Sequence, residues 1–206
     1  MVGSSLLALA LTLTPIVMGF IPLQQHHVAF GKVRKCAAPN DAATCTEVNV
    51  DLGDRTYPIY IGDGLLTRSV EDAASYLQPH VHGSQVLVVT NEVIAPLLLE
   101  ATVSALKHGS SGANLRVEIL ILPDNEVTPS EATKTLETLG AITDYAIEKA
   151  LDRKCTFVAL GGGVIGDMVG FAAACYVRGV NFIQIPTTLM AMVDSSVGGK
   201  VLLLLS

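Results

Sequence analysis

Continuous apolar runs constrain the fold of this 206-residue chain more than any other feature. Residues 85–89 and 155–160 form two such runs, without the strict polar alternation of a half-exposed strand. Strands of this kind are covered on both faces, as in a parallel sheet. Stretches with helical periodicity lie between and after them, at 94–108, 131–151 and 165–176. The alternation predicts an α/β domain, Rossmann-like, with a mostly parallel sheet.

An N-terminal β-hairpin is predicted before this pattern. Residues 48–52 and 57–61 alternate apolar and polar side chains, and a Gly-Asp-Arg turn lies between them. We also expect strands at 115–122 and 181–185, and a short helix at 65–77. The longest predicted helix should face the core with one apolar stripe, formed by Leu136, Leu139, Ile142 and Ile147.

Composition excludes several classes of protein. Hydrophobic residues make up 50% of the chain and charged residues 16%, which is too apolar for a disordered chain. The net charge of -6 argues against a general nucleic-acid binder, because phosphate backbones are bound by clustered Lys and Arg. Four cysteines in 206 residues are too few and too scattered for a disulfide framework, and because no C-x-x-C pair occurs we also expect no structural zinc site. The cysteines, expected to be reduced thiols, are Cys36, Cys45, Cys155 and Cys175.

The N-terminal segment up to residue 40 differs in charge from the rest of the chain. It contains no Asp or Glu, and its basic residues are Lys32, Arg34 and Lys35. Such a break is typical of a processed or targeting segment rather than of part of a fold. The apolar stretch Leu6–Leu23 fits a membrane helix interrupted by prolines, a secretory signal without a basic start, or an acid-poor transit peptide. Residues 37–44 are predicted to form a polar linker.

A glycine-rich turn is the strongest candidate for a binding site. Gly161-x-Gly163-x-x-Gly166 follows a predicted strand and opens a predicted helix, which is the context of a dinucleotide-binding fingerprint. Glycine leaves backbone N–H groups accessible to pyrophosphate oxygens, and the helix N-terminus adds partial positive charge. The acid that usually follows about 20 residues later is missing, and Asp167 either complements the helix dipole or contacts a ligand. The alternative is a turn that only packs the helix on the strand.

Further polar residues lie around the last predicted strand. Arg178 stands alone between an apolar helix and a buried strand, so it should form an ion pair or bind an anion. Thr187 and Thr188 follow that strand. Lys200, behind two glycines, suits an anionic substrate, and a solvated surface lysine is the alternative. The histidines show no spacing typical of metal ligands.

Several motifs of this sequence resemble 3-dehydroquinate synthase, and the hairpin motif resembles the plant enzymes. The resemblance covers residues 47–200, for which it implies an NAD-binding domain. It does not extend to the leader and linker at 1–46 or to the tail at 201–206. The motifs are Val50–Gly62, Ala159–Asp167, Tyr176–Val180, Phe182–Thr188 and Val193–Lys200.

The resemblance implies a phosphorus-oxygen lyase of the shikimate pathway, which leads to chorismate and the aromatic amino acids. In this family, 3-deoxy-D-arabino-heptulosonate 7-phosphate becomes 3-dehydroquinate and phosphate. NAD takes a hydride from a ring alcohol and returns it, and a divalent metal, zinc or cobalt, polarises the reacting hydroxyl. The family also suggests a homodimer that binds a small sugar phosphate and has no nucleic-acid or membrane partner. The plant-like hairpin favours a plastid transit peptide and a location in the chloroplast stroma.

The same resemblance carries the family's site residues over to this sequence. Asp194, Lys200 and Arg178 match residues that act on the substrate, with Arg178 serving the site of a neighbouring subunit. No metal ligand is implied within the chain, because the family's ligands lie in an all-helical domain that follows Lys200. The implied cofactor-binding residues are Asn91, Glu131, Lys134, Gly162, Gly163, Val164, Ile165, Gly166, Asp167, Thr187 and Thr188.

The sequence departs from the family pattern in two places. Pro129 and Ser130 replace the usual Asp-Gly before Glu131, and Pro123–Glu126 resembles a displaced copy of the missing part. The family's C-terminal all-helical domain is absent, so we expect a truncated chain that is inactive alone. The alternatives are a non-catalytic, truncated nucleotide-binding isoform and a related sugar-phosphate cyclase. The run Val193–Lys200 favours the synthase over metal-dependent polyol dehydrogenases.

Overall fold

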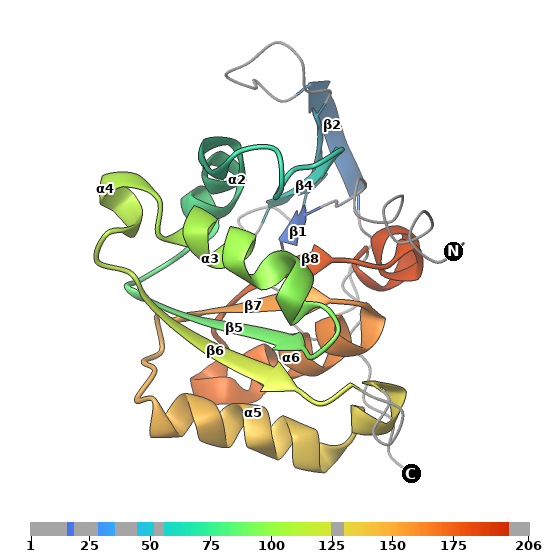
Figure 1. Ribbon diagram of the computed structural model, residues 1–206. Helices are drawn as coiled ribbons and strands as arrows, with labels where there is room; N and C mark the ends of the chain where they lie inside the picture. The colour runs from blue at the N-terminus through green and yellow to red at the C-terminus, as the bar shows by residue number, and fades with distance from the viewer. Residues whose placement is uncertain (1–15, 19–28, 36–44, 52–55, 125–129, 198–206) are drawn as a thin grey trace, which may run out of the picture.

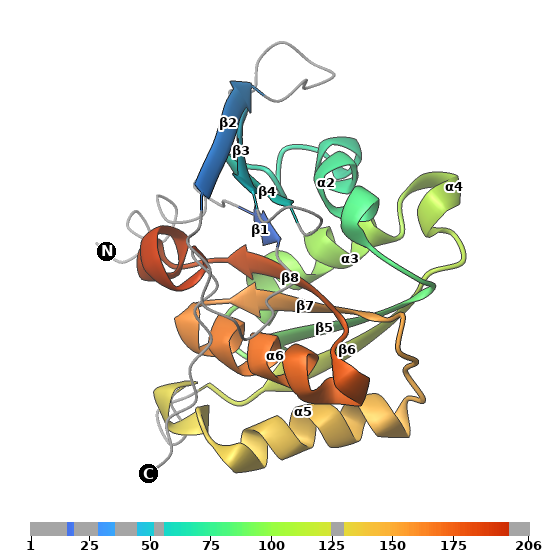
Figure 2. The same ribbon diagram turned by 180° about the vertical axis from the view of Figure 1, so that it is seen from behind.

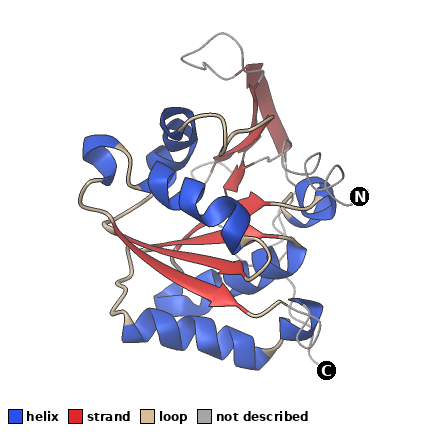
Figure 3. Ribbon diagram, in the orientation of Figure 1, coloured by secondary structure: helices blue, strands red, loops and turns tan. Residues whose placement is uncertain are grey.

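The computed structural model describes residues 16–18, 29–35, 45–51, 56–124 and 130–197. Their strands form one eight-stranded sheet in the order β2-β3-β4-β1-β8-β7-β5-β6. Helices cover both faces of the half that contains β5 to β8 (Figure 3). The strands are β1 (Ile16–Met18), β2 (Ala29–Lys35), β3 (Cys45–Asp51), β4 (Tyr57–Gly62), β5 (Gln85–Asn91), β6 (Arg116–Leu122), β7 (Thr156–Gly161) and β8 (Asn181–Pro186). The α-helices are α2 (Val70–Leu77), α3 (Glu100–Leu106), α4 (Gly109–Gly112), α5 (Leu136–Glu148) and α6 (Gly163–Cys175).

Strands β8, β7, β5 and β6 are parallel and carry the core of the domain. Phe157 of β7 is paired with Leu87 of β5 on one side and with Phe182 of β8 on the other. The two faces of these strands enter two hydrophobic clusters, one with α2 and α3 and one with α5 and α6 (Figures 1 and 2). Burial on both faces explains the continuous apolar runs and confirms the Rossmann-like α/β class.

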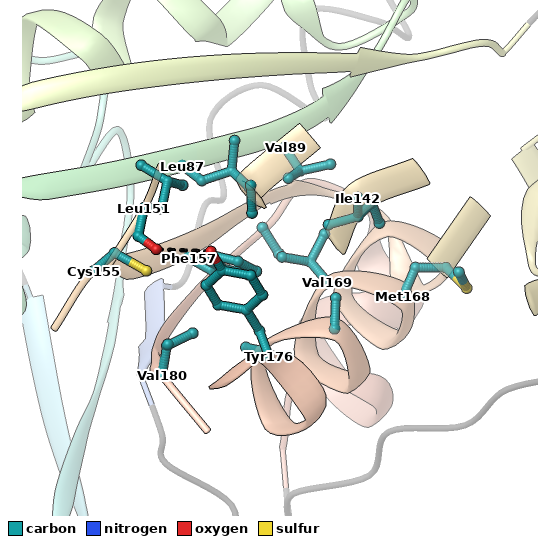
Figure 4. Packing of buried hydrophobic residues seen from close by; sticks show 14 of the residues in the cluster. Leu87, Val89, Ile142, Leu151, Cys155, Phe157, Met168, Val169, Tyr176 and Val180 are labelled. Atoms are coloured by element: carbon teal, nitrogen blue, oxygen red, sulfur yellow. Dashed lines mark hydrogen bonds between the residues drawn. The ribbon is translucent and has the colours of Figure 1, made fainter. Parts of the chain in front are cut away.

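Tyr176 closes the cluster on the side of α5 and α6 (Figure 4). Its ring packs against Phe157 with the ring centroids 5.4 Å apart. Its hydroxyl donates a 2.7 Å hydrogen bond to the carbonyl of Leu151, so the polar tip of this buried side chain is satisfied. The packing of Tyr176 against Phe157 holds the end of α6 against β7, the strand that precedes this helix.

The N-terminal half of the sheet is antiparallel. β3 pairs with β4 from Cys45 opposite Gly62 to Val50 opposite Tyr57, which confirms the predicted hairpin. β2 extends this hairpin, and β1 joins it to β8, so the antiparallel part is larger than the predicted hairpin.

β1 and β2 lie within the segment 1–46 that the sequence predicts to be a leader and linker. In the structure they join the sheet, because the edges of β3, β4 and β8 offer backbone groups that an extended segment can pair with. No helix in the described part of the chain is both long and apolar enough to cross a bilayer. Most of the apolar stretch Leu6–Leu23 lies outside the described residues.

Capping residues start two helices later than the periodicity predicts. The hydroxyl of Ser69 accepts a 3.0 Å hydrogen bond from the backbone N–H of Asp72, so α2 begins after Ser69. The hydroxyl of Thr135 accepts a 3.3 Å bond from the N–H of Thr138 and starts α5. The helix predicted at 94–108 is divided into a π-helical turn, η3 (Ala95–Leu99), and α3.

The predicted apolar stripe of α5 is wrong at both ends. Ile142 is fully buried and Leu139 packs beside it, whereas Leu136 and Ile147 are 55% and 63% exposed. At about 100° per residue, Ile147 lies roughly 140° around the helix axis from Ile142, so both cannot face the core. Ala146, one turn after Ile142, is the buried residue instead.

The expectation of four reduced cysteines is also wrong. Cys45 is disulfide-bonded, and Cys36 lies outside the described residues. β2 pairs with β3 as far as Thr46, the residue next to Cys45. Residues that lie opposite each other on antiparallel strands have Cα–Cα distances short enough for a disulfide. Cys155 and Cys175 are free. Burial raises the pKa of the Cys155 thiol to about 12, which keeps it protonated and unreactive at neutral pH.

We predict that Ile142→Ala destabilises the fold by about 2–4 kcal/mol, because it leaves a cavity between α5 and the sheet. Ile147→Ala on the same helix should change the free energy of unfolding by less than about 0.5 kcal/mol, because that side chain is exposed. Urea denaturation of both variants measures the difference. Equal losses would contradict the orientation of α5.

Candidate functional site

The carboxyl ends of the four parallel strands meet at one edge of the sheet, where β7 leads directly into α6. Gly162 is the N-cap of α6 in an extended conformation, and Gly163 is its first residue. The N–H of Thr187, just after β8, donates a 2.9 Å hydrogen bond to the carbonyl of Gly161. The ends of β7 and β8 are thereby held together at the start of α6 (Figure 2).

The glycines of this turn allow close packing around it. A Cβ at Gly161 would lie 2.8 Å from Cβ of Ile165, and one at Gly163 would lie 3.0 Å from Oγ of Ser195. A Cβ at Gly166 would lie 2.1 Å from Nε2 of Gln184. Packing therefore accounts for glycine at Gly161, as the alternative interpretation of the motif proposed, whereas Gly163 and Gly166 face the ends of side chains that can move.

The start of α6 also provides hydrogen-bond donors. No side chain caps this helix, because its N-cap is glycine. The N–H groups of the first helical turn have no acceptor within the helix, and they carry the positive end of the helix dipole. Such an end binds anions.

Buried polar groups without hydrogen-bond partners surround the turn. Among the described residues they include Oγ1 of Thr187, the Oγ atoms of Ser195 and Ser196, and Nε2 of Gln184. Ser195 ends a π-helical turn, η6 (Ala191–Ser195), and such turns are frequent at functional sites. An unsatisfied buried hydroxyl costs about 1–3 kcal/mol, so these groups are suited to a ligand with several oxygen atoms.

An ion pair lies beside the same helix. Nζ of Lys134 is 2.7 Å from Oδ2 of Asp167, and the two side chains are only 11% and 10% exposed. Lys134 follows the 3-10 turn η4 (Ser130–Thr133), and Asp167 belongs to α6. The structure thus brings together two residues that the sequence assigned separately to the cofactor.

A second polar group lies at the ends of β5 and β6. The amide of Asn91 donates to Asp124, and its oxygen accepts a 2.9 Å hydrogen bond from the N–H of Ile94. The N–H of Asp124 donates to the carboxylate of Glu92. Asp124, which belongs to the displaced motif Pro123–Glu126, is therefore hydrogen-bonded to Asn91. This pair lies at the same edge of the sheet as the glycine turn.

Other predicted site residues lie elsewhere. Arg178 is exposed at the far end of α6, about 20 Å along the helix from the glycine turn, so its charge is not buried as the sequence suggested. Arg178 and Val177 have left-handed backbones, with φ of 78° and 39°. Asp194 and Glu131 are exposed, and Lys200 lies outside the described residues. Thr188, by contrast, lies at the glycine turn, because a Cβ at Gly162 would be 3.1 Å from its Cγ2, and its hydroxyl accepts a 3.3 Å hydrogen bond from the N–H of Ala191.

Sequence reasoning missed Gln184 and the hydroxyls of Ser195 and Ser196. Gln184 is the one polar side chain in the run from Phe182 to Pro186, and a single polar residue in a buried strand is a usable signal. Within the described ranges, no group of three or more His, Cys, Asp or Glu residues could hold a metal ion.

Comparison with known proteins shows what this chain is similar to. The family model for the N-terminal domain of 3-dehydroquinate synthase matches residues 124–203. The chloroplastic 3-dehydroquinate synthase of Arabidopsis thaliana is 62% identical over 155 residues, which cover 75% of this chain and 32% of the relative. That of Hydrogenovibrio crunogenus is 56% identical over 153 residues, covering 74% and 38%. This chain therefore spans about a third of the length of these curated relatives.

The fold is similar to that of a solved synthase structure. A crystal structure of 2-deoxy-scyllo-inosose synthase, complexed with carbaglucose-6-phosphate, NAD+ and Co2+, superposes with a TM-score of 0.55 at 23% identity. The match covers 72% of this chain and 37% of that one. This likeness supports the Rossmann-like fold.

We predict that Gly161→Ala destabilises the protein by about 1–3 kcal/mol, because the new Cβ overlaps the buried Ile165 and overpacks the turn. Gly140→Ala in α5 is the matched control. Its Cβ meets no atom within 4 Å, so alanine should be neutral or stabilise by up to about 1 kcal/mol through helix propensity. Thermal unfolding of the two variants measures both effects. A neutral Gly161→Ala would contradict the close packing at the start of α6.

Proposed function

We propose that this chain, which is similar to the N-terminal part of 3-dehydroquinate synthases, supplies the NAD-binding domain of such an enzyme at residues 47–200. The proposed reaction converts 3-deoxy-D-arabino-heptulosonate 7-phosphate to 3-dehydroquinate and phosphate. The observation that carries the proposal is the start of α6, where uncapped N–H groups lie beside hydroxyls without partners. A pyrophosphate has enough acceptor oxygens to satisfy both sets of donors.

The residues around the turn fit a bound dinucleotide. The N–H groups of Gly163, Val164 and Ile165 would bind its pyrophosphate, with Gly162 and Gly166 keeping side chains out of the way. Thr187 and Thr188 would donate from the end of β8. Asn91 would take the adenosine side, and Glu131 and Lys134 would approach from η4. The orphan hydroxyl of Thr187 supports this arrangement most directly.

The substrate would bind beyond the nicotinamide end of the cofactor. The motif match assigns Asp194 to the polyol and Lys200 to a substrate anion. Arg178 would contribute to the site of a second subunit, and its exposed position at the far end of α6 supports this part of the proposal. A homodimer is accordingly part of the proposed function.

NAD, when bound, would accept a hydride from a substrate alcohol and return it. The protein's part is to hold the phosphates, orient the sugar and exclude water around the turn. The family's metal, zinc or cobalt, does not fit the described residues, which contain no suitable ligand cluster.

A related sugar-phosphate cyclase is the second candidate function. The fold does not distinguish the two, because 2-deoxy-scyllo-inosose synthase shares it. Identity to 3-dehydroquinate synthases is 52–62% in the curated relatives compared, against 23% to that cyclase, and this difference supports the synthase. The name of the Arabidopsis relative supports a location in the chloroplast stroma.

We predict that the 206-residue chain binds NAD+ and that Thr187→Val weakens binding about tenfold or more. Among the described residues the Thr187 hydroxyl has no hydrogen-bond partner, so its removal costs the described fold no hydrogen bond but removes one to the ligand. Thr102→Val is the matched control, since that hydroxyl is buried in α3 and already bonded to Leu98. Isothermal titration calorimetry measures the three affinities. A chain that does not bind NAD+, or equal binding by the Thr187 variant, would contradict the proposal.

A further inference from the structure

A short segment before β5 connects separate parts of the fold. Residues 78–82 comprise the 3-10 turn η2 (Gln78–His80) and the two residues after it. Nε2 of Gln78 lies 2.8–3.3 Å from three carbonyl oxygens at and just after the end of α3. The backbone of His82 forms two hydrogen bonds, 3.1 and 3.2 Å long, with Oγ1 of the buried Thr156 at the start of β7. This segment, the clasp, therefore joins α3 to β7.

The clasp also contacts the hairpin β3–β4, through a side chain that can change its charge. Nε2 of His80 is 3.2 Å from the hydroxyl of Tyr60 in β4. The ring of Tyr60 packs against the rings of both His80 and Tyr76, with centroids 5.8 and 5.2 Å apart. Burial raises the pKa of both tyrosines, so they stay neutral. In an imidazole protonated on Nδ1, Nε2 accepts a hydrogen bond from the hydroxyl, and protonation of Nε2 removes that acceptor.

The environment of His80 opposes its protonation. Partial burial among aromatic rings deprives an imidazolium of water, and it lowers the pKa of His80 below its ordinary value of 6.5. The nearby imidazole of His82 lowers this pKa further, whereas Glu47 of β3 raises it. Glu47 lies opposite Tyr60 in the hairpin, but its carboxylate already accepts a 2.8 Å hydrogen bond from Asn49. A proton on His80 is therefore accommodated poorly while the hairpin is docked.

We propose that the clasp is a pH-sensitive connection between the hairpin and the parallel half of the sheet, and that protonation of His80 loosens the hairpin from η2. The amide of Gln78 and the backbone of His82 do not titrate, so the contacts with α3 and β7 persist. Once the hairpin loosens, the imidazole of His80 is solvated and binds a proton more tightly. Docking of the hairpin is thus strongest above pH 6.5 and weakens as the pH falls below that value.

Amide hydrogen exchange of the 206-residue chain without NAD+ tests this inference independently of the proposed function. Between pH about 7.5 and about 5.5, the protection factors of β4 should fall severalfold, and those of β5 should stay constant. His80→Gln, which keeps an acceptor for the hydroxyl but does not titrate, should abolish this pH dependence. His82→Gln is the matched control and should retain it, because His82 contributes backbone bonds to the clasp.

Equal protection of β4 at both pH values would overturn the proposal. A fall that persists in His80→Gln would also overturn it, because another group would then be responsible. If His80→Gln does not fold, NMR titration of the His80 ring in the unaltered chain decides. Its midpoint should lie below pH 6.5 and coincide with the loss of β4 protection, and a midpoint at or above 6.5 would contradict the inference.

Discussion

Close packing between α6 and the ends of β7 and β8 is the constraint on which the rest of the site depends. It requires glycine at Gly161, where a Cβ would lie 2.8 Å from the side chain of Ile165, and it leaves little room at Gly163 and Gly166, beside Ser195 and Gln184. The same absence of side chains leaves the first turn of α6 uncapped. One packing requirement therefore produces a helix N-terminus whose N–H groups can meet a ligand.

The positive potential at the start of α6 follows from the same uncapped helix end. The helix dipole attracts anions, and Lys134 forms an ion pair with Asp167 of the same helix. The unpartnered hydroxyl of Thr187 supplies a further donor from the end of β8. Donors from the helix backbone and from the end of β8 therefore lie near one another, which supports the proposed pyrophosphate site.

The sequence predicted those features that depend on local pattern. The hairpin β3–β4, the parallel strands and the glycine turn follow from alternation, apolar runs and the position of Gly161. Features that depend on distant contacts could not be predicted in this way. The burial of Ile142 rather than Ile147, the exposure of Arg178, the disulfide at Cys45, and the pairing of Lys134 with Asp167 each depend on where separate segments pack.

An NMR titration of the 206-residue chain with NAD+ would test the central claim most directly, because it reports on each backbone amide. Binding at the start of α6 predicts chemical-shift changes concentrated at Gly162–Gly166 and Thr187–Ser196, with the hairpin β3–β4 unaffected. Changes centred on the hairpin, or no changes at the start of α6 at saturating NAD+, would contradict it.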